Sequence, residues 1–193
     1  APVPASAVLS GAVVKVGIIG LIRFLPLSEA VPDWGFVLTA AGFATAFYAV
    51  AIGLTQRHPK AVLAYSSVSQ MGVVAAVLGM GLAAGDATAG MAAAFYASHH
   101  VLVKGALFLS VGVIAACGPG RRAVVLVPAL LLCLGLGGLP FTGGAIAKYA
   151  VKDQLDVGVV GWLAVASAVG TTLLMLHFFR RLAAYGSEIG RAH

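Results

Sequence analysis

The stretch RAVVLVPALLLCLGLGGLPFTGGAIAKYAVK, Arg122 to Lys152, decides how this chain folds. As one straight helix it would be roughly 46 Å long at 1.5 Å per residue, well beyond the roughly 30 Å core of a bilayer. Its middle is rich in glycine, which weakens a helix, and contains a proline, which lacks a backbone donor. We therefore predict a broken helix, with halves at about 123–136 and 144–155. The residues expected to break it are Gly138, Pro140, Gly143 and Gly144.

The rest of the chain is equally apolar. Of its 193 residues, 61% are hydrophobic and only 9% are charged, whereas a soluble domain carries about 25% charged residues. Runs of about 20 apolar residues predict helices that cross a bilayer. We expect an all-α integral membrane protein with about six transmembrane helices, one of them discontinuous. A single membrane domain, residues 1–193, would hold these spans at about 6–24, 34–56, 61–82, 87–117, 123–155 and 157–179.

Charged residues fall mostly in the short loops between spans, and alternate loops differ in sign. One side of the membrane would receive Arg57, Lys60, Arg121, Arg122, Arg180 and Arg181. The other side would receive Arg23, Glu29, Asp33, Asp86, Lys152, Asp153 and Asp156. The positive-inside rule therefore predicts that the loops with Arg57, Arg121 and Arg180 face the cytoplasm.

Three lysines, Lys15, Lys104 and Lys148, remain inside spans. A charge at the bilayer centre costs roughly 2.5–3.5 kcal/mol on insertion scales, and such groups normally face the bundle interior and mark ion pathways. Lys104 is the only Lys, Arg, Asp or Glu between residues 87 and 120, and His100 shares its helix face. We interpret Lys15, His100, Lys104 and Lys148 as a candidate proton relay. The alternatives are a snorkelling Lys104, a packing or interfacial Lys15, and a Lys148 that anchors at the outer interface.

Other polar residues of the spans allow two interpretations. His99 points about 100° away from His100 and is either a second relay member or a group that packs between helices. Ser66, Ser67 and Gln70, in the patch AYSSVSQMG, either let helices pack closely or line a hydrated half-channel on the cytoplasmic side. His177, near the end of the last span, is more typical of an interfacial residue.

The sequence contains none of the signatures of soluble enzymes, such as a Gly-rich phosphate loop after a strand, HExxH or a serine elbow. Cys117 and Cys133 have no metal-ligand spacing and imply no disulfide framework. The net charge of +6 comes largely from loops between apolar runs, which is typical of a membrane protein. We predict no catalytic residues, no metal, no cofactor and no nucleic-acid partner for this chain.

Three segments resemble signature stretches of one family: KAVLAYSSVSQMG (Lys60–Gly72), HHVLVKGALFLSVG (His99–Gly112) and GLPFTGGAIAKYAVKD (Gly138–Asp153). The family is that of the antiporter-like proton-translocating subunits of respiratory complex I (NADH:quinone oxidoreductase), Mrp-type sodium/proton antiporters and membrane-bound hydrogenases. The first segment, APVPASAVLSGAVVKVGIIGLIRF, is similar to the stretch that enters the eighth helix of those proteins. The match covers nearly the whole chain, which looks like a C-terminal-half fragment of something longer.

The resemblance implies a fold and roles for several residues. The chain would hold the eighth helix and the second of two inverted five-helix repeats. Lys15 matches the lysine that links the two half-channels, and Lys104 with His100 matches the central relay. Lys148 matches the terminal charged residue of the second half-channel, and Lys60 a basic residue at the cytoplasmic start of its helix. The sequence departs from the family at Tyr96, a histidine in some members, and at His99, often an asparagine.

Two functions follow as hypotheses. The chain is either a proton-translocating subunit, with Na⁺/H⁺ antiport as a variant, or a structural, anchoring subunit whose polar residues do not conduct. Its expected partners are the lipid bilayer, protons or Na⁺, and other membrane subunits of a complex I-like or Mrp-like assembly. The expected location is a bacterial inner (cytoplasmic) membrane. Whether its parent assembly is an oxidoreductase-type translocase or an antiporter is left open by the sequence.

Overall fold

A computed structural model describes residues 2–189 of the chain. The helical segments are α1 (Val3–Val8), the π-helical turn η1 (Leu9–Val13), α2 (Val14–Phe24), α3 (Pro32–Thr55), α4 (Pro59–Ala84), α5 (Thr88–Ala116), the 3₁₀ turn η2 (Pro119–Arg121), α6 (Arg122–Gly137), α7 (Gly143–Ala150), α8 (Lys152–Leu155) and α9 (Gly158–Ile189). Within this range the structure contains no strand. Five helical stretches are long and apolar enough to cross a membrane: Val3–Phe24, α3, α4, α5 and α9. The predicted all-α membrane fold is confirmed.

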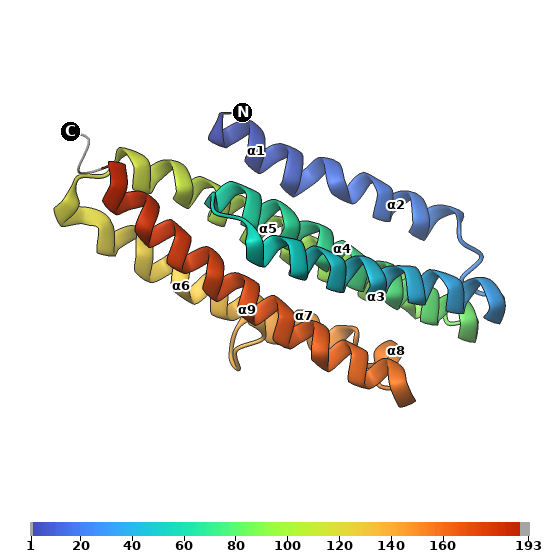
Figure 1. Ribbon diagram of the computed structural model, residues 1–193. Helices are drawn as coiled ribbons and strands as arrows, with labels where there is room; N and C mark the ends of the chain where they lie inside the picture. Colours follow the sequence, from blue (N-terminus) through green and yellow to red (C-terminus); the bar gives the residue numbers. More distant parts are fainter. Residues whose placement is uncertain (1, 190–193) are drawn as a thin grey trace.

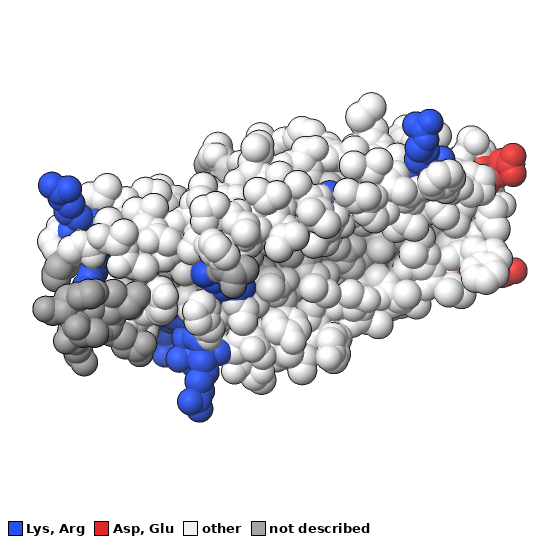
Figure 2. Space-filling view, turned by 90° about the horizontal axis from the view of Figure 1, so that it is seen from above, with Lys and Arg blue, Asp and Glu red and all other residues white. Residues whose placement is uncertain are grey.

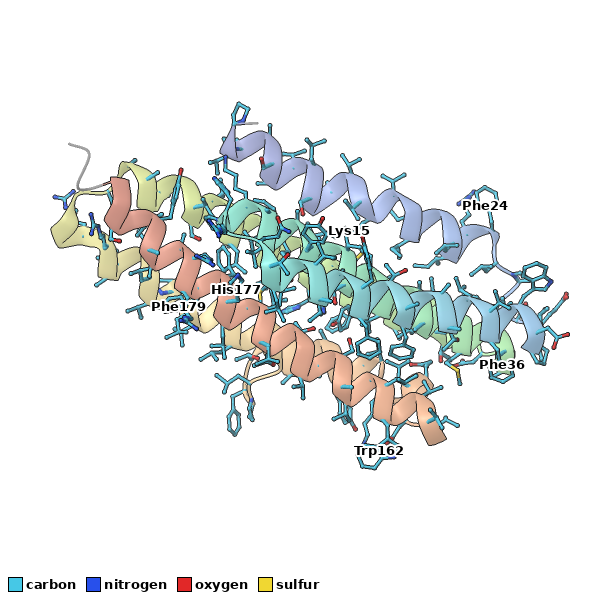
Figure 3. The ribbon with its side chains drawn as sticks, in the orientation of Figure 1. Lys15, Phe24, Phe36, Trp162, His177 and Phe179 are labelled. Carbon is cyan, nitrogen blue, oxygen red and sulfur yellow. The ribbon has the colours of Figure 1, made fainter. Side chains whose placement is uncertain are left out.

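The long helices pack side by side, and the chain reverses direction at the two ends of the bundle (Figure 1). Helix α4 lies at the centre, since it contacts α2, α3, α5, α8 and α9. Over an 18-residue apolar stretch of α4, 67% of the residues are buried. The corresponding share is 17% in Val3–Phe24, at the periphery. Phe24, Phe36 and Trp162 point away from the bundle, as expected of side chains that face lipid (Figure 3).

Helices α3 and α4 approach each other so closely that side chains are excluded from their contact. A Cβ atom placed on Gly42 would lie 2.5 Å from the Gly72 carbonyl oxygen, and one placed on Gly72 would lie 2.5 Å from the Gly42 oxygen. Small residues of this kind allow membrane helices to pack backbone against backbone. The contact fixes the position of α4 and of the polar patch that it carries.

The predicted discontinuous helix is confirmed, and its break spans residues 138–142 between α6 and α7. Gly138 adopts a left-handed φ of 99°, and its N–H and that of Leu139 bond back to the carbonyls of Gly135 and Leu134. This double bond pattern is a Schellman motif, which ends a helix. Thr142 then caps α7 by accepting a hydrogen bond from the Ala145 N–H.

Pro140 lies inside the break, and the two glycines 143 and 144 open α7. The second half-helix differs from the prediction, because Val151 separates α7 from the short α8 instead of continuing one helix to Leu155. The last helix is also longer than predicted: α9 runs ten residues beyond position 179. It continues past Arg180 and Arg181 because Leu182 is again fully buried, so the helix still packs against its neighbours there.

The first span begins at Val3 instead of residue 6 and contains a π-helical turn that the sequence did not suggest. Such turns occur often at functional sites. At the ends of the bundle, basic side chains gather mostly towards one end, and acidic side chains lie at the other (Figure 2). This distribution matches the two sets of alternate loops.

The start of α7 gives a test of the break. A Cβ atom on Gly144 would collide with the Gly135 carbonyl oxygen at the end of α6, and this backbone atom cannot rotate away. Gly144→Ala should therefore lower stability by about 1–3 kcal/mol, the usual cost of overpacking, measured as a lower thermal midpoint in detergent. Gly105→Ala is the control, because nothing lies within 4 Å of a Cβ atom there. Equal midpoints for the two variants would show that the halves do not pack as described.

Candidate functional site

Lys104 is among the largest side chains that are completely buried in the described part of the chain. Its ammonium on α5 donates one hydrogen bond, at 3.1 Å, to the carbonyl oxygen of Leu63 on α4. No carboxylate is paired with Lys104 among the side chains that the structure describes. A buried charge without a counter-ion is costly, and the neutral amine is correspondingly favoured in such a place.

Lys15 lies between the first span and the rest of the bundle, about midway along it (Figure 3). It is 5% exposed and donates, at 2.7 Å, to the carbonyl oxygen of Ser10 in the π-helical turn. The Ser10 hydroxyl is 2.8 Å from that of Ser67 on α4. Ser67 in turn donates, at 3.2 Å, to the Leu63 carbonyl. Leu63 thus accepts from both Ser67 and Lys104, and a row of polar contacts joins the two lysines.

His100 is fully buried on α5, four residues before Lys104. Neither of its ring nitrogens has a hydrogen-bond partner among the described residues. His100 and Lys104 lie one turn apart on the same face of α5, and the polar row described above joins Lys104 to Lys15. The structure therefore brings together three of the four residues proposed for a relay.

Four residues before His100, Tyr96 begins a second polar row. Its hydroxyl donates to the Gln70 side-chain oxygen, and the Gln70 amide donates at 2.7 Å to the Thr171 hydroxyl of α9. Thr171 donates at 2.9 Å to the carbonyl of Ser167. Tyr96, Gln70, Ser167 and Thr171 also line a cavity of about 220 Å³, large enough for several water molecules.

Lys148 lines the same cavity from α7. Its ammonium donates at 2.6 Å to the carbonyl of Gly137, which the break leaves without a helical partner. The cavity extends from there to Lys152 and Asp156. Unlike the other three, Lys148 is only partly buried, so the break and the open cavity give this lysine access to water.

The other predicted site residues lie elsewhere. His99 turns away from His100 and packs against the start of α7, where a Cβ atom on Gly143 would be 2.9 Å from its ring. Lys60 is half-buried at the start of α4, and Ser66 is buried with its hydroxyl 4.0 Å from the Met175 sulfur. His177 is bonded to the carbonyl of Gln56 at the end of α3. The hydrogen bonds of Ser66 and His177 thus lie outside the two polar rows.

The sequence analysis missed Ser10, Ser167 and Thr171. Each is a small hydroxyl in an apolar run, and such residues usually bond to their own helix, so nothing local marks them. Ser10 and Thr171 bond to Ser67 and Gln70 of α4, which are distant from them in the chain. Ser167 joins the row only through Thr171. Among the described residues no group of three His, Cys, Asp or Glu side chains comes together that could hold a metal ion.

The model of the family described as NADH:quinone oxidoreductase/Mrp antiporter, transmembrane, matches residues 1–175. The chain belongs to this family. Its membership confirms the resemblance seen in the sequence and makes the chain a multi-pass membrane segment of an antiporter-like subunit.

Similar proteins include staphylococcal proteins provisionally named antiporter subunit mnhA2. Those of Staphylococcus aureus (strain MRSA252) and Staphylococcus saprophyticus are each 31% identical to the chain over 177 residues, and that of Staphylococcus aureus (strain USA300) is 30% identical. Each alignment covers 80% of this chain and 22% of the relative. The chain thus spans about a fifth of the length of these antiporter-family relatives.

A tether outside the spans holds the far end of the broken helix. One oxygen of Asp86, in the α4–α5 loop, accepts from the backbone and hydroxyl of Thr88, and the other accepts at 3.0 Å from the amide of Gln154 on α8. These side-chain hydrogen bonds, that of Gln154 foremost, lower the pKa of Asp86 below its usual value of 3.8. The tether fixes α8 and therefore the wall of the cavity that Leu155 forms.

The sign of the pKa shift sets the pH dependence. A carboxyl whose pKa is lower in the folded state adds stability above its unfolded pKa and loses it as pH falls through the folded value. Asp86→Ala should therefore lower the thermal midpoint at pH 6 to 7, and its difference from the parent should shrink below about pH 3.8. The exposed Asp33→Ala is the control. A difference that stays constant with pH would rule out the charged tether.

Proposed function

We propose that this chain is part of a proton-translocating subunit, and that protons move through Lys15, Lys104, His100 and Lys148. The observation that carries the proposal is the burial of Lys104, whose ammonium has one carbonyl as its partner and no carboxylate beside it among the described residues. If Lys104 served only the fold, an apolar residue of similar volume in its place would leave the protein as stable or make it more stable. A lysine whose charge switches needs such a desolvated place.

The order of the groups supports a path across the middle of the bundle. Lys15 and Lys104 are joined by the first polar row, and His100 stands on the same face of α5 as Lys104 and Tyr96. The second row then leads to the cavity that holds Lys148. Gaps between these groups can be bridged by water, which carries hydrogen bonds nearly as well as direct contacts.

Charge repulsion gives the path a mechanism. When Lys104 is protonated, its charge opposes a second proton on the neighbouring groups of the path, and when it is neutral it can accept one. A proton that leaves through Lys148 reaches the cavity that extends to Lys152 and Asp156. Protonation states thus change one after another along the row, with no large movement of helices.

Further parts of the proposal concern the whole protein. The end of the bundle with Arg57, between α3 and α4, and Arg121, between α5 and α6, would face the cytoplasm of a bacterial cell, following the positive-inside rule. Arg180, predicted in a loop on the same side, lies within α9. Residues 1–193 would form one membrane domain within a longer subunit, because the relatives are several times longer than the chain. Other membrane subunits would be its partners, as in the multi-subunit assemblies of the family.

Substitutions of Lys104 test the proposal. Lys104→Ala and Lys104→Arg in the complete subunit should each reduce proton transport by about 10²-fold, the lower range for a proton-transfer group. Arginine fails because it keeps its charge at any accessible pH. Transport is measured as acidification of reconstituted vesicles at matched amounts of assembled protein, and ²²Na⁺ uptake in the same vesicles identifies the cation.

The control is Ser98→Ala on the same helix, where an exposed hydroxyl bonds only to the carbonyl of Ala94. It should transport as the parent does. If Lys104→Arg transports normally, Lys104 is a fixed charge and the relay is wrong. If Lys104→Ala also transports normally, this part of the chain is structural.

A further inference from the structure

We propose that the hydroxyls of Ser10 and Ser67 form the proton bridge between Lys15 and Lys104. This inference deepens the proposed function and rests on it. The two serines come from different helices, the π-helical turn η1 and α4, and their oxygens are 2.8 Å apart. They stand between the two buried lysines: Lys15 bonds to the Ser10 carbonyl, and Ser67 and Lys104 both bond to the Leu63 carbonyl.

Hydroxyls are the groups in this row that can pass a proton on. The carbonyls of Ser10 and Leu63 can only accept hydrogen bonds, so they hold the ammonium groups but cannot conduct. A hydroxyl donates and accepts at once. Ser67 uses its one hydroxyl proton to donate to the Leu63 carbonyl, so Ser10 is the donor in the bond between the two serines. The two hydrogen bonds therefore run in the direction from Lys15 to Lys104.

The proton balance of one transfer is simple. Lys15 loses a proton to the Ser10 oxygen, as the Ser10 proton passes to Ser67 and the Ser67 proton passes to the amine of Lys104. Each serine ends as a hydroxyl, Lys15 ends neutral, and Lys104 ends charged. Rotation of each hydroxyl restores the starting direction. At each end the lysine turns from its carbonyl to the neighbouring hydroxyl, or one water closes the gap.

The π-helical turn explains why Ser10 is available. Lys15 donates to the carbonyl five residues earlier, at Ser10, so its ammonium lies beside this turn instead of extending away from it. The wider turn therefore gathers the lysine, the Ser10 carbonyl and the Ser10 hydroxyl at one level of the bundle, opposite Ser67. π-helical turns occur often at functional sites, and this agrees with the role proposed for η1.

The experiment uses the complete subunit, with vesicle acidification normalised to assembled protein. Ser10→Ala and Ser67→Ala should each slow proton transport at least about tenfold, since positioned proton-transfer groups are commonly worth 10²–10⁴-fold. The double variant should be no slower than the slower single variant, because the two hydroxyls act as one unit. Ser10→Thr keeps the hydroxyl and should stay within about twofold of the parent, a difference of less than 0.5 kcal/mol. Ser6→Ala is the matched control, since Ser6 lies one turn earlier and bonds to the Pro2 carbonyl.

The outcomes separate this bridge from the relay as a whole. If Lys104→Ala abolishes transport and Ser10→Ala does not slow it, the bridge is overturned and the proposed function stands. If Ser10→Thr is as slow as Ser10→Ala, the serines serve only as a clamp between helices, which also overturns the bridge. If Lys104→Ala transports normally, the proposed function itself fails, and the bridge with it. Loss in both alanine variants with recovery in Ser10→Thr supports the bridge.

Discussion

The hydrogen bond from Lys104 to the carbonyl of Leu63 is the contact on which the rest of the site depends. The ammonium group of Lys104 lies at the centre of an apolar bundle, and its partner is a single backbone oxygen. Such a charge persists only when the surrounding helices hold polar groups in reach or let the charge leave. In the proposed relay the polar rows, the cavity and the break meet this requirement, because each would offer the proton a next position.

Helix α4 makes the arrangement possible. It packs backbone to backbone against α3 at Gly42 and Gly72, and so leaves its other faces for α2, α5, α8 and α9. Ser67 faces the first span, the Leu63 carbonyl faces α5, and Gln70 joins Tyr96 to α9. The hydrogen bonds of Ser67 and Gln70 therefore hold neighbouring helices together, and the hydrated half-channel stays a prediction.

Much of the fold could be predicted from the sequence, because in lipid the backbone has few options. Apolar runs of about 20 residues can only be helices, and the glycines around Pro140 could only end one. The burial of Lys104 followed from its distance to both ends of its span. The π-helical turn at Leu9–Val13 could not be predicted, since its sequence LSGAV resembles other parts of the apolar spans and its contacts are with α4 and α5, which are distant in the chain.

The polar partners were also beyond the sequence. The bonds between Ser10 and Ser67, Gln70 and Thr171, and Asp86 and Gln154 join residues separated by 57, 101 and 68 positions. A single sequence carries no signal for such pairs. A polar group in an apolar span is costly when it is unpaired, so the sequence predicts that these groups have partners. It does not predict which residues the partners are.

The central claim is that Lys104 changes its charge while protons move. Infrared difference spectra of the complete subunit, with ¹⁵N-labelled lysine, would report this directly when recorded with and without an imposed proton gradient. The lysine signal that disappears in Lys104→Gln belongs to Lys104. We predict that its ammonium band changes in intensity when the gradient is applied. An ammonium band of Lys104 that stays constant under both conditions would contradict the account.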